Sequence, residues 1–82
     1  MTTPLTLEWT LVTEGLEQRV ENRENCFTLT LDGYRLYPIQ EQIEITRHKS
    51  SDQIGFGKIV ELTWRDNQTI CMYQLISLYS VN

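Results

Sequence analysis

Residues 55–82 decide the fold. They read Gly-Phe-Gly-Lys-Ile-Val-Glu-Leu-Thr-Trp at 55–64, Arg-Asp-Asn-Gln at 65–68 and Thr-Ile-Cys-Met-Tyr-Gln-Leu-Ile-Ser-Leu-Tyr-Ser-Val-Asn at 69–82. Two β-rich runs flank a short polar turn, which predicts an antiparallel hairpin. The second run is apolar at even and odd positions alike, so a strand over 69–81 has apolar side chains on both faces. Such a strand needs cover on both faces, and we expect it at the centre of the domain.

The length of this last strand predicts a curved sheet. A straight strand of about 12 residues spans roughly 40 Å, whereas a compact chain of this size is only about 30 Å across. The strand therefore has to bend or bulge, and the polar residues Gln74 and Ser77 are the positions where we expect this. A strand that crosses the domain and curls is typical of a small, nearly closed barrel filled by its own side chains.

Composition is that of one folded domain, which we expect to span residues 1–82. The net charge of −4 argues against general binding to a nucleic-acid backbone, which needs a basic surface. Residues 1–4 lack the features of a secretory signal, and no apolar run approaches the roughly 20 residues of a membrane span. We therefore expect a cytoplasmic protein, with Cys26 and Cys71 as reduced core residues.

Upstream of the hairpin, apolar and polar residues alternate in several short runs. They predict strands over residues 5–12, 26–31, 34–37 and 43–47. In the first of these strands, the inward face is predicted to carry Leu5, Leu7, Trp9 and Leu11.

Turn residues separate these runs. Glu14-Gly15 ends the first strand, and Asp32-Gly33 predicts a tight hairpin turn that leads into residues 34–37. Gly55 and Gly57 bracket Phe56 and predict a sharp corner or a bulge before the last hairpin. Residues 16–25 fit either an edge strand protected by charge, which we favour, or one helical turn.

Two runs resemble a known family. They are Gly-Tyr-Arg-Leu-Tyr-Pro-Ile at 33–39 and Tyr-Gln-Leu-Ile-Ser-Leu-Tyr-Ser-Val-Asn at 73–82, with Glu-Gln-Arg at 17–19 upstream. In these runs the chain is similar to a family of short uncharacterised bacillar cytosolic proteins, a domain of unknown function. The resemblance covers nearly the whole chain. It implies a cytosolic bacterial protein and gives no residue a role.

The residue types that catalysis needs are scattered. Cys26, His48 and Cys71 are far apart in sequence and lack the paired spacing of metal ligands. Both cysteines fall in strand-like runs, where a thiol is inert. Glu44 and Glu61 alternate with apolar residues, which a solvated strand face explains. We therefore expect no metal, no cofactor and no enzyme, because a filled barrel leaves no deep pocket for an acid or a base.

One small cluster of basic residues stands out. Arg47, His48 and Lys49 are consecutive, and Arg35 and Tyr37 are candidates to lie nearby. Such a patch is able to receive an anion or an RNA phosphate, with an aromatic ring stacking on a base. An ordinary charged loop explains the same residues, and the acidic net charge favours that interpretation.

Together these observations predict an all-β domain, a small antiparallel β-barrel or strongly coiled sheet of about six strands. We expect a non-catalytic interaction module that recognises a protein partner, or a second copy of itself, through an exposed sheet edge or aromatic patch. The alternative is a small RNA-binding barrel that uses Arg35, Tyr37, Arg47, His48 and Lys49.

Overall fold

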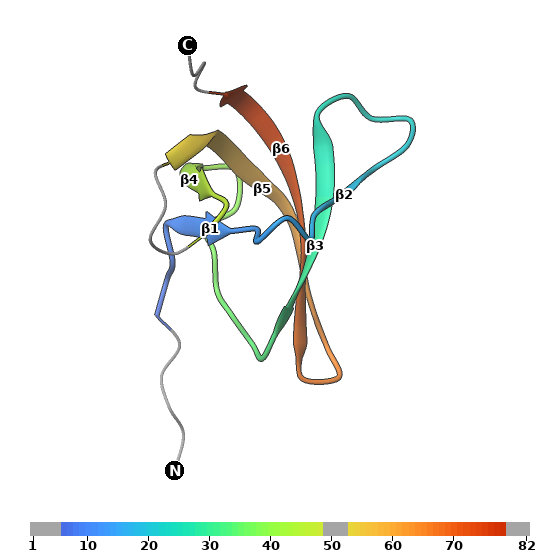
Figure 1. Cartoon of the computed structure of the whole chain (residues 1–82). Coiled ribbons are helices and arrows are strands. Elements are labelled where there is room, and N and C mark those ends of the chain that lie inside the picture. The colour runs from blue at the N-terminus through green and yellow to red at the C-terminus, as the bar shows by residue number, and fades with distance from the viewer. Residues whose placement is uncertain (1–5, 49–52, 79–82) are drawn as a thin grey trace.

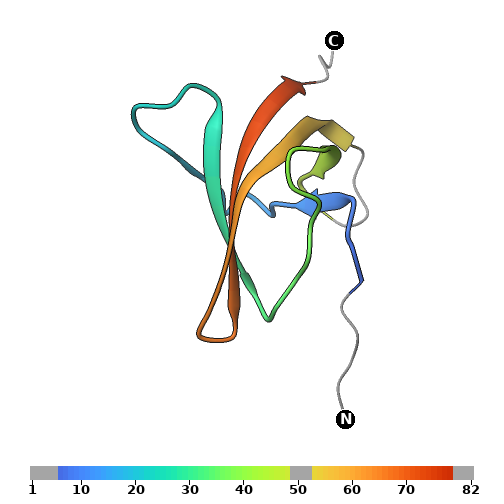
Figure 2. The same cartoon turned by 180° about the vertical axis from the view of Figure 1, so that it is seen from behind.

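A computed structural model describes residues 6–48 and 53–78 of the chain. The strands are β1 (Thr10–Val12), β2 (Gln18–Arg19), β3 (Cys26–Asp32), β4 (Gln42–Thr46), β5 (Gln53–Arg65) and β6 (Gln68–Leu78). They form one six-stranded sheet in the order β1-β4-β5-β6-β3-β2. The sheet curls into a half-barrel (Figures 1 and 2), which confirms the predicted fold class. Within residues 6–48 and 53–78 there is no helix suited to crossing a membrane.

The predicted hairpin is β5 and β6, and β6 lies inside the sheet between β5 and β3. Its turn residues Asp66 and Asn67 both have positive φ, 52° and 63°, as a two-residue turn between twisted strands requires. The predicted strand residues 79–81 lie outside the described part of the chain.

The two faces of β6 are not buried equally. Cys71 and Tyr73 point into the core, whereas Ile70 and Met72 on the opposite face are only half-buried. The prediction of full cover on both faces is therefore wrong, because the half-barrel is a single layer. Its outer face gains partial cover from side chains such as Arg23, whose Nη1 lies 3.5 Å from the Met72 sulfur.

Bulges bend the sheet as the strand length predicts. On β6, Leu75 and Ser77 pair with consecutive residues of β5, which leaves Ile76 as the extra residue between the two predicted polar positions. On β5, Val60 is extra in the same way, because Ile59 and Glu61 pair with consecutive residues of β6. Each bulge increases the local twist, and together they curl the long hairpin.

The two glycines lie inside β5 and not before it. Gly55 and Gly57 pair with both neighbouring strands. A β-carbon on Gly57 would lie 2.9 Å from the main-chain oxygen of Gln74 and 3.3 Å from a side-chain carbon of Ile45. The close approach of the backbones is what requires a glycine at this position.

The core lies on the concave face of the half-barrel. It consists of Leu11, Leu29, Tyr37, Ile43, Ile45, Ile59, Cys71 and Tyr73. Phe27 and Leu31 pack against it, as the alternation in β3 predicts. Trp9, which was predicted to face inward, does not pack against the core, since it is 52% exposed. Pairing in β1 begins only at Thr10, so Trp9 lies before the strand and beyond the core, while the predicted inward residue Leu5 is not among the described residues.

Two predictions of strand pairing are wrong. Asp32-Gly33 is no hairpin, because β3 pairs with β6 and β2, and residues 34–37 cross the concave side as an irregular segment. The positive φ of Gly33, 77°, turns the chain out of the sheet. In addition, β1 pairs with β4 in parallel, while the other strand pairs are antiparallel as predicted.

Candidate functional site: a cleft between two sheet edges

The N-terminal run contacts both edges of the curled sheet. β1 pairs with β4 at one edge, and β2, the short strand we favoured for residues 16–25, pairs with β3 at the other. Residues 13–17 cross from one edge to the other (Figure 1). The crossing is a tight turn in which the Leu16 N–H donates to the Thr13 carbonyl, with positive φ at Glu14 and Gly15. Because of this turn, no strand pairs with both β1 and the second half of β3. The sheet therefore has an opening between these two strands.

On the β1 side, the main-chain groups of Thr10 and Val12 face this opening. The Trp9 carbonyl and the Thr13 N–H both bond to β4. Successive residues of a strand direct their polar groups to opposite sides, so those of Thr10 and Val12 point away from β4. Within residues 6–48 and 53–78, they have no main-chain partner there.

On the β3 side of the opening, main-chain groups also lack a neighbouring strand. The Asn25 carbonyl and the Gly33 N–H bond to the β6 side, and the Cys26 carbonyl bonds to Val20 on the opposite side. The main-chain groups of Thr30 and Asp32 therefore point away from β6, in the same direction as the Cys26 carbonyl. At these two residues β2 no longer pairs with β3. We call the space between Thr10–Val12 and residues 29–32 the edge cleft.

The two strands that border the edge cleft do not pair with each other. No Cα atom of β1 lies within 8 Å of a Cα atom of β3, whereas paired strands lie about 4.8 Å apart. One added strand between the two edges needs about twice that spacing. The edges are therefore too far apart to pair with each other.

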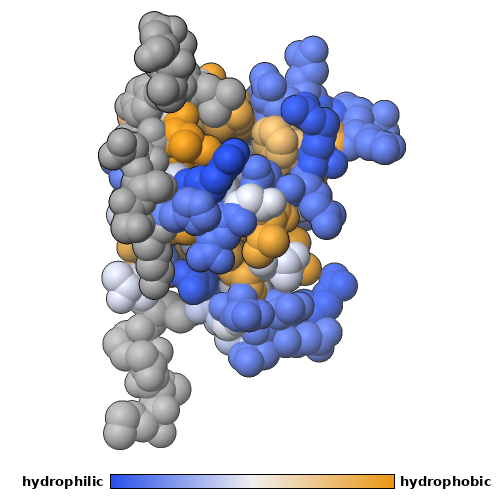
Figure 3. Space-filling model, in the orientation of Figure 1, coloured by the Kyte–Doolittle hydropathy of each residue, from blue (hydrophilic) through white to orange (hydrophobic). Residues whose placement is uncertain are grey.

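A cavity of about 650 Å³ occupies the edge cleft. It is lined by Glu8, Thr10, Val12, Thr13, Glu14, Leu16, Leu29, Thr30, Leu31, Asp32, Arg35 and Tyr37. Figure 3, from the side of Figure 1, shows apolar residues among polar ones in the middle of this face. The prediction of a nearly closed barrel filled by its own side chains did not include this cavity, which lies where the two sheet edges stay apart.

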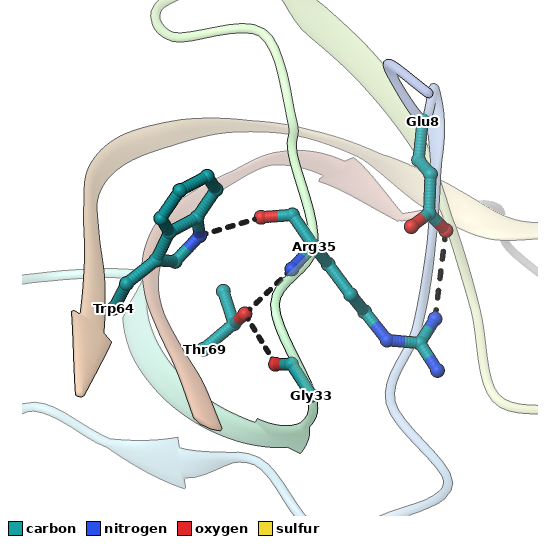
Figure 4. Close-up of polar contacts among 5 residues, drawn as sticks. All are labelled: Glu8, Gly33, Arg35, Trp64 and Thr69. Carbon is teal, nitrogen blue, oxygen red and sulfur yellow. Dashed lines mark hydrogen bonds and ion pairs between the residues drawn. The ribbon is translucent and has the colours of Figure 1, made fainter. Parts of the chain in front are cut away.

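Arg35 and Tyr37 are held at the base of the edge cleft. The Thr69 hydroxyl accepts from the Arg35 N–H at 2.8 Å and donates to the Gly33 carbonyl at 2.7 Å, which fixes this irregular segment to β6. The Arg35 guanidinium lies 3.5 Å from a Glu8 carboxylate oxygen (Figure 4). The one base that lines the cavity is thus already paired with an acid.

An exposed aromatic pair borders this segment. The rings of Tyr34 and Trp64 lie 5.3 Å apart, and the Trp64 Nε1–H donates to the Arg35 carbonyl at 2.9 Å. The Tyr34 hydroxyl accepts from the Asn67 N–H at 3.1 Å. These bonds fix both rings at the hairpin end of the half-barrel. Sequence alone left their exposure open.

Burial suppresses ionisation below the edge cleft. It raises the pKa of Tyr37 to about 12, with the Glu8 carboxylate and Cys71 adding to the effect and Arg35 opposing it. Burial, then Glu8, likewise raises the pKa of Cys71 to about 12. The pKa of Tyr73 is also raised, mainly by burial and then by Glu17. These three groups are neutral at physiological pH and unsuited to acid–base or thiolate chemistry there.

These pKa values predict alkaline unfolding. Above pH 9 for Cys71 and pH 10 for Tyr37, the unfolded chain loses protons that the folded chain keeps up to about pH 12. The free energy of unfolding should therefore fall as pH rises from 9 to 12, by up to about 1.4 kcal/mol per pH unit for each group. Urea titrations at several pH values between 9 and 12 measure this fall in the free energy of unfolding. Tyr37→Phe should flatten the fall above pH 10, and Tyr34→Phe, which removes an exposed phenol, should not.

The structure describes four of the five residues of the predicted anion or RNA site. Tyr37 is 2% exposed, so its ring is not accessible for stacking on a base, and Arg35 is paired with Glu8. Arg47 and His48 are exposed after β4 but do not line the edge cleft. Lys49 lies outside the described residues.

Sequence reasoning missed the residues that line the edge cleft apart from Arg35 and Tyr37. Their one sequence signal is Glu14-Gly15, which was recognised as the end of a strand but not as a crossing between sheet edges.

The cysteines form no reactive site in the described residues. Cys26 and Cys71 are both free and buried, as predicted from the sequence. Across residues 6–48 and 53–78, no three His, Cys, Asp or Glu residues are grouped as a metal site requires.

Comparison with known proteins agrees with this architecture. The chain is 38% identical to the uncharacterised protein YtmB of Bacillus subtilis (strain 168) over 79 residues, which is 96% of each chain. The X-ray crystal structure of YtmB covers 100% of this chain and 99% of its own, with a TM-score of 0.86 and the same 38% identity. The family model for DUF2584, a domain of unknown function, matches residues 1–82. The resemblance noted in the sequence is confirmed, and the chain belongs to the DUF2584 family.

Proposed function

We propose that this protein is a non-catalytic interaction module that binds a short extended segment of a protein partner in the edge cleft. The observation that carries the proposal is a pair of unpaired strand edges facing each other across a cavity. A peptide that adds as a strand gains main-chain hydrogen bonds from either edge, while its alternate side chains enter the cavity.

The dimensions of the edge cleft favour a short segment. The crossing at residues 13–17 bounds one end, and Leu36, which bridges to Leu7, bounds the other. The free β3 edge between them runs from Leu29 to Asp32, about four residues or roughly 13 Å of extended chain. Apolar side chains of such a segment would contact Val12 and Leu31, which are only half-buried.

The chemistry of the described residues supports binding without catalysis. Tyr37 and Cys71 below the cavity have pKa values of about 12 and are neutral near pH 7. A general acid or base works best when its pKa lies near the operating pH. Cys26 and Cys71 are both free and buried, as is usual in a reducing compartment, and we propose a cytoplasmic location.

Self-association through the edge cleft is disfavoured by charge. A symmetric dimer built on this surface would bring the Glu14 and Asp32 carboxylates of two copies together, and like charges in a contact are repulsive. RNA phosphates would meet the same carboxylates. We therefore propose a partner other than a second copy or an RNA.

Thr30→Pro tests the proposal. The Thr30 N–H points away from β6, so proline removes no hydrogen bond between β3 and β6 but deletes the donor that an added strand needs. Peptides selected on the native protein from a displayed random heptapeptide library should bind Thr30→Pro at least tenfold more weakly. They should bind Thr30→Ala, which keeps the N–H, within twofold of the native protein.

Three results would overturn this function. The first is a library that yields no binder, and the second is binders that tolerate Thr30→Pro. The third is a dimer in sedimentation equilibrium that dissociates in Thr30→Pro, because the occupant would then be a second copy. Thermal melts should show Thr30→Pro folded at the assay temperature. If it is unfolded, Val12→Pro, the equivalent change on the β1 edge, takes its place in the same assay.

A further inference from the structure

The charges in the edge cleft indicate which chemical class of segment it binds. Among the residues that line the cavity, Glu8, Glu14 and Asp32 are acids and Arg35 is the one base. Arg35 is paired with Glu8. Glu14 and Asp32 are exposed, and within residues 6–48 and 53–78 neither carboxylate has an ion-pair partner. The lining therefore has two carboxylates without an ion-pair partner among the described residues. One is at the end of β3, and the other is on the crossing, where the Glu14 N–H donates to the Arg47 carbonyl.

The surroundings of these carboxylates match a long basic side chain. Glu14 shares the cavity wall with Val12 and Leu16, and Asp32 adjoins Leu31. Lysine and arginine pack their aliphatic stems along apolar surface and keep the charged head at a polar rim. A partly enclosed acidic cleft also concentrates cations, since its low-dielectric walls strengthen the field inside.

We infer that the edge cleft selects an extended segment that carries a lysine or arginine, whose charged head is attracted by the Glu14 and Asp32 carboxylates at the two ends of the cleft while its stem packs on the apolar wall. This inference rests on the proposed function, since it names the chemistry of the segment that the edges bind. Acidic segments are repelled by the same two carboxylates.

Three synthetic peptides test the inference. They are capped Ser-Thr-Val-X-Val-Thr-Ser, with lysine, methionine or glutamate at X, and their affinities are measured by isothermal titration at 50 mM NaCl. The lysine peptide should bind about tenfold more tightly than the methionine peptide, and the glutamate peptide should bind most weakly. At 500 mM NaCl the difference between lysine and methionine should shrink severalfold, because salt screens exposed charges.

Protein variants locate the selectivity. Glu14→Gln and Asp32→Asn should each reduce the preference for lysine over methionine by about threefold to fivefold and leave the methionine peptide unchanged. Glu61→Gln is the matched control, because Glu61 is exposed and does not line the edge cleft. That variant should keep the full preference.

The outcomes separate this inference from the proposed function. If all three peptides bind equally and are lost in Thr30→Pro, the basic preference is wrong and strand addition stands. If lysine is preferred but Glu14→Gln and Asp32→Asn do not change the preference, the assigned carboxylates are wrong. If none of the peptides binds at 1 mM, and the random library yields no binder either, both proposals fall.

Discussion

Replacing Ile59 by alanine is expected to remove about 2–5 kcal/mol from the free energy of unfolding. Ile59 is 0% exposed and belongs to the core on the concave face. It lies beside the bulge at Val60, and its carbonyl also accepts from the Gln40 N–H, so backbone bonds on both sides restrict collapse around a cavity. A small domain has about 0.05–0.15 kcal/mol of stability per residue, so this variant loses a large share of the total.

Ile76→Ala is the control for this substitution. Ile76 lies on the paired strand β6, but it is the bulged residue and is 51% exposed. The same change of side chain there should alter stability by no more than about 0.5 kcal/mol. Urea unfolding of both variants measures the difference. Equal losses at the two positions would show that the concave face is not the core.

Gly57→Val is the second large effect, with an expected loss of about 3 kcal/mol or more. A β-carbon at this position meets the Gln74 carbonyl oxygen at 2.9 Å, and that atom belongs to the backbone of the central strand. Neither strand can move aside without breaking the pairing of β5 with β6, and forced packing of this kind costs about 1–3 kcal/mol or more.

Lys58→Val controls for the effect of valine itself. Lys58 is the next residue of β5, directs its side chain to the opposite face and is half-buried. Valine is a good strand residue there, and we expect little change in stability. If Gly57→Val melts within about 2 °C of the native protein, the strands are not as close at this point as the structure has them.

The interior position of β6 and the curl of the sheet were predictable from the sequence. Apolar residues at even and odd positions predicted the interior place of β6 in the sheet, although only one of its faces is fully buried. The length of the strand demands a bend. The bulge at Ile76 lies between the predicted positions Gln74 and Ser77. These features depend on local pattern and on chain geometry, and both can be read from the sequence.

The pairing errors arise where distant contacts override local signals. Asp32-Gly33 has the composition of a hairpin turn, yet β3 pairs with β6, which is about 40 residues away in sequence. Alternation extended the first strand back to Leu5, but alternation cannot show where a neighbouring strand ends. The edge cleft was missed for the same reason. It exists because residues 13–17 carry the chain from β1, which pairs with β4, to β2, which pairs with β3, and only the fold brings β1 opposite β3.

Amide hydrogen exchange at the two free edges tests the central claim most directly. In the unbound protein, the N–H groups of Thr10, Val12, Thr30 and Asp32 should exchange quickly, while those of Leu11, Leu29 and Leu31 are protected by strand pairing. Saturating Ser-Thr-Val-Lys-Val-Thr-Ser should slow exchange at the β1 or the β3 pair at least tenfold. If these amides are already protected without peptide, or exchange unchanged when the peptide is bound, the edge cleft is not where this protein binds its partner.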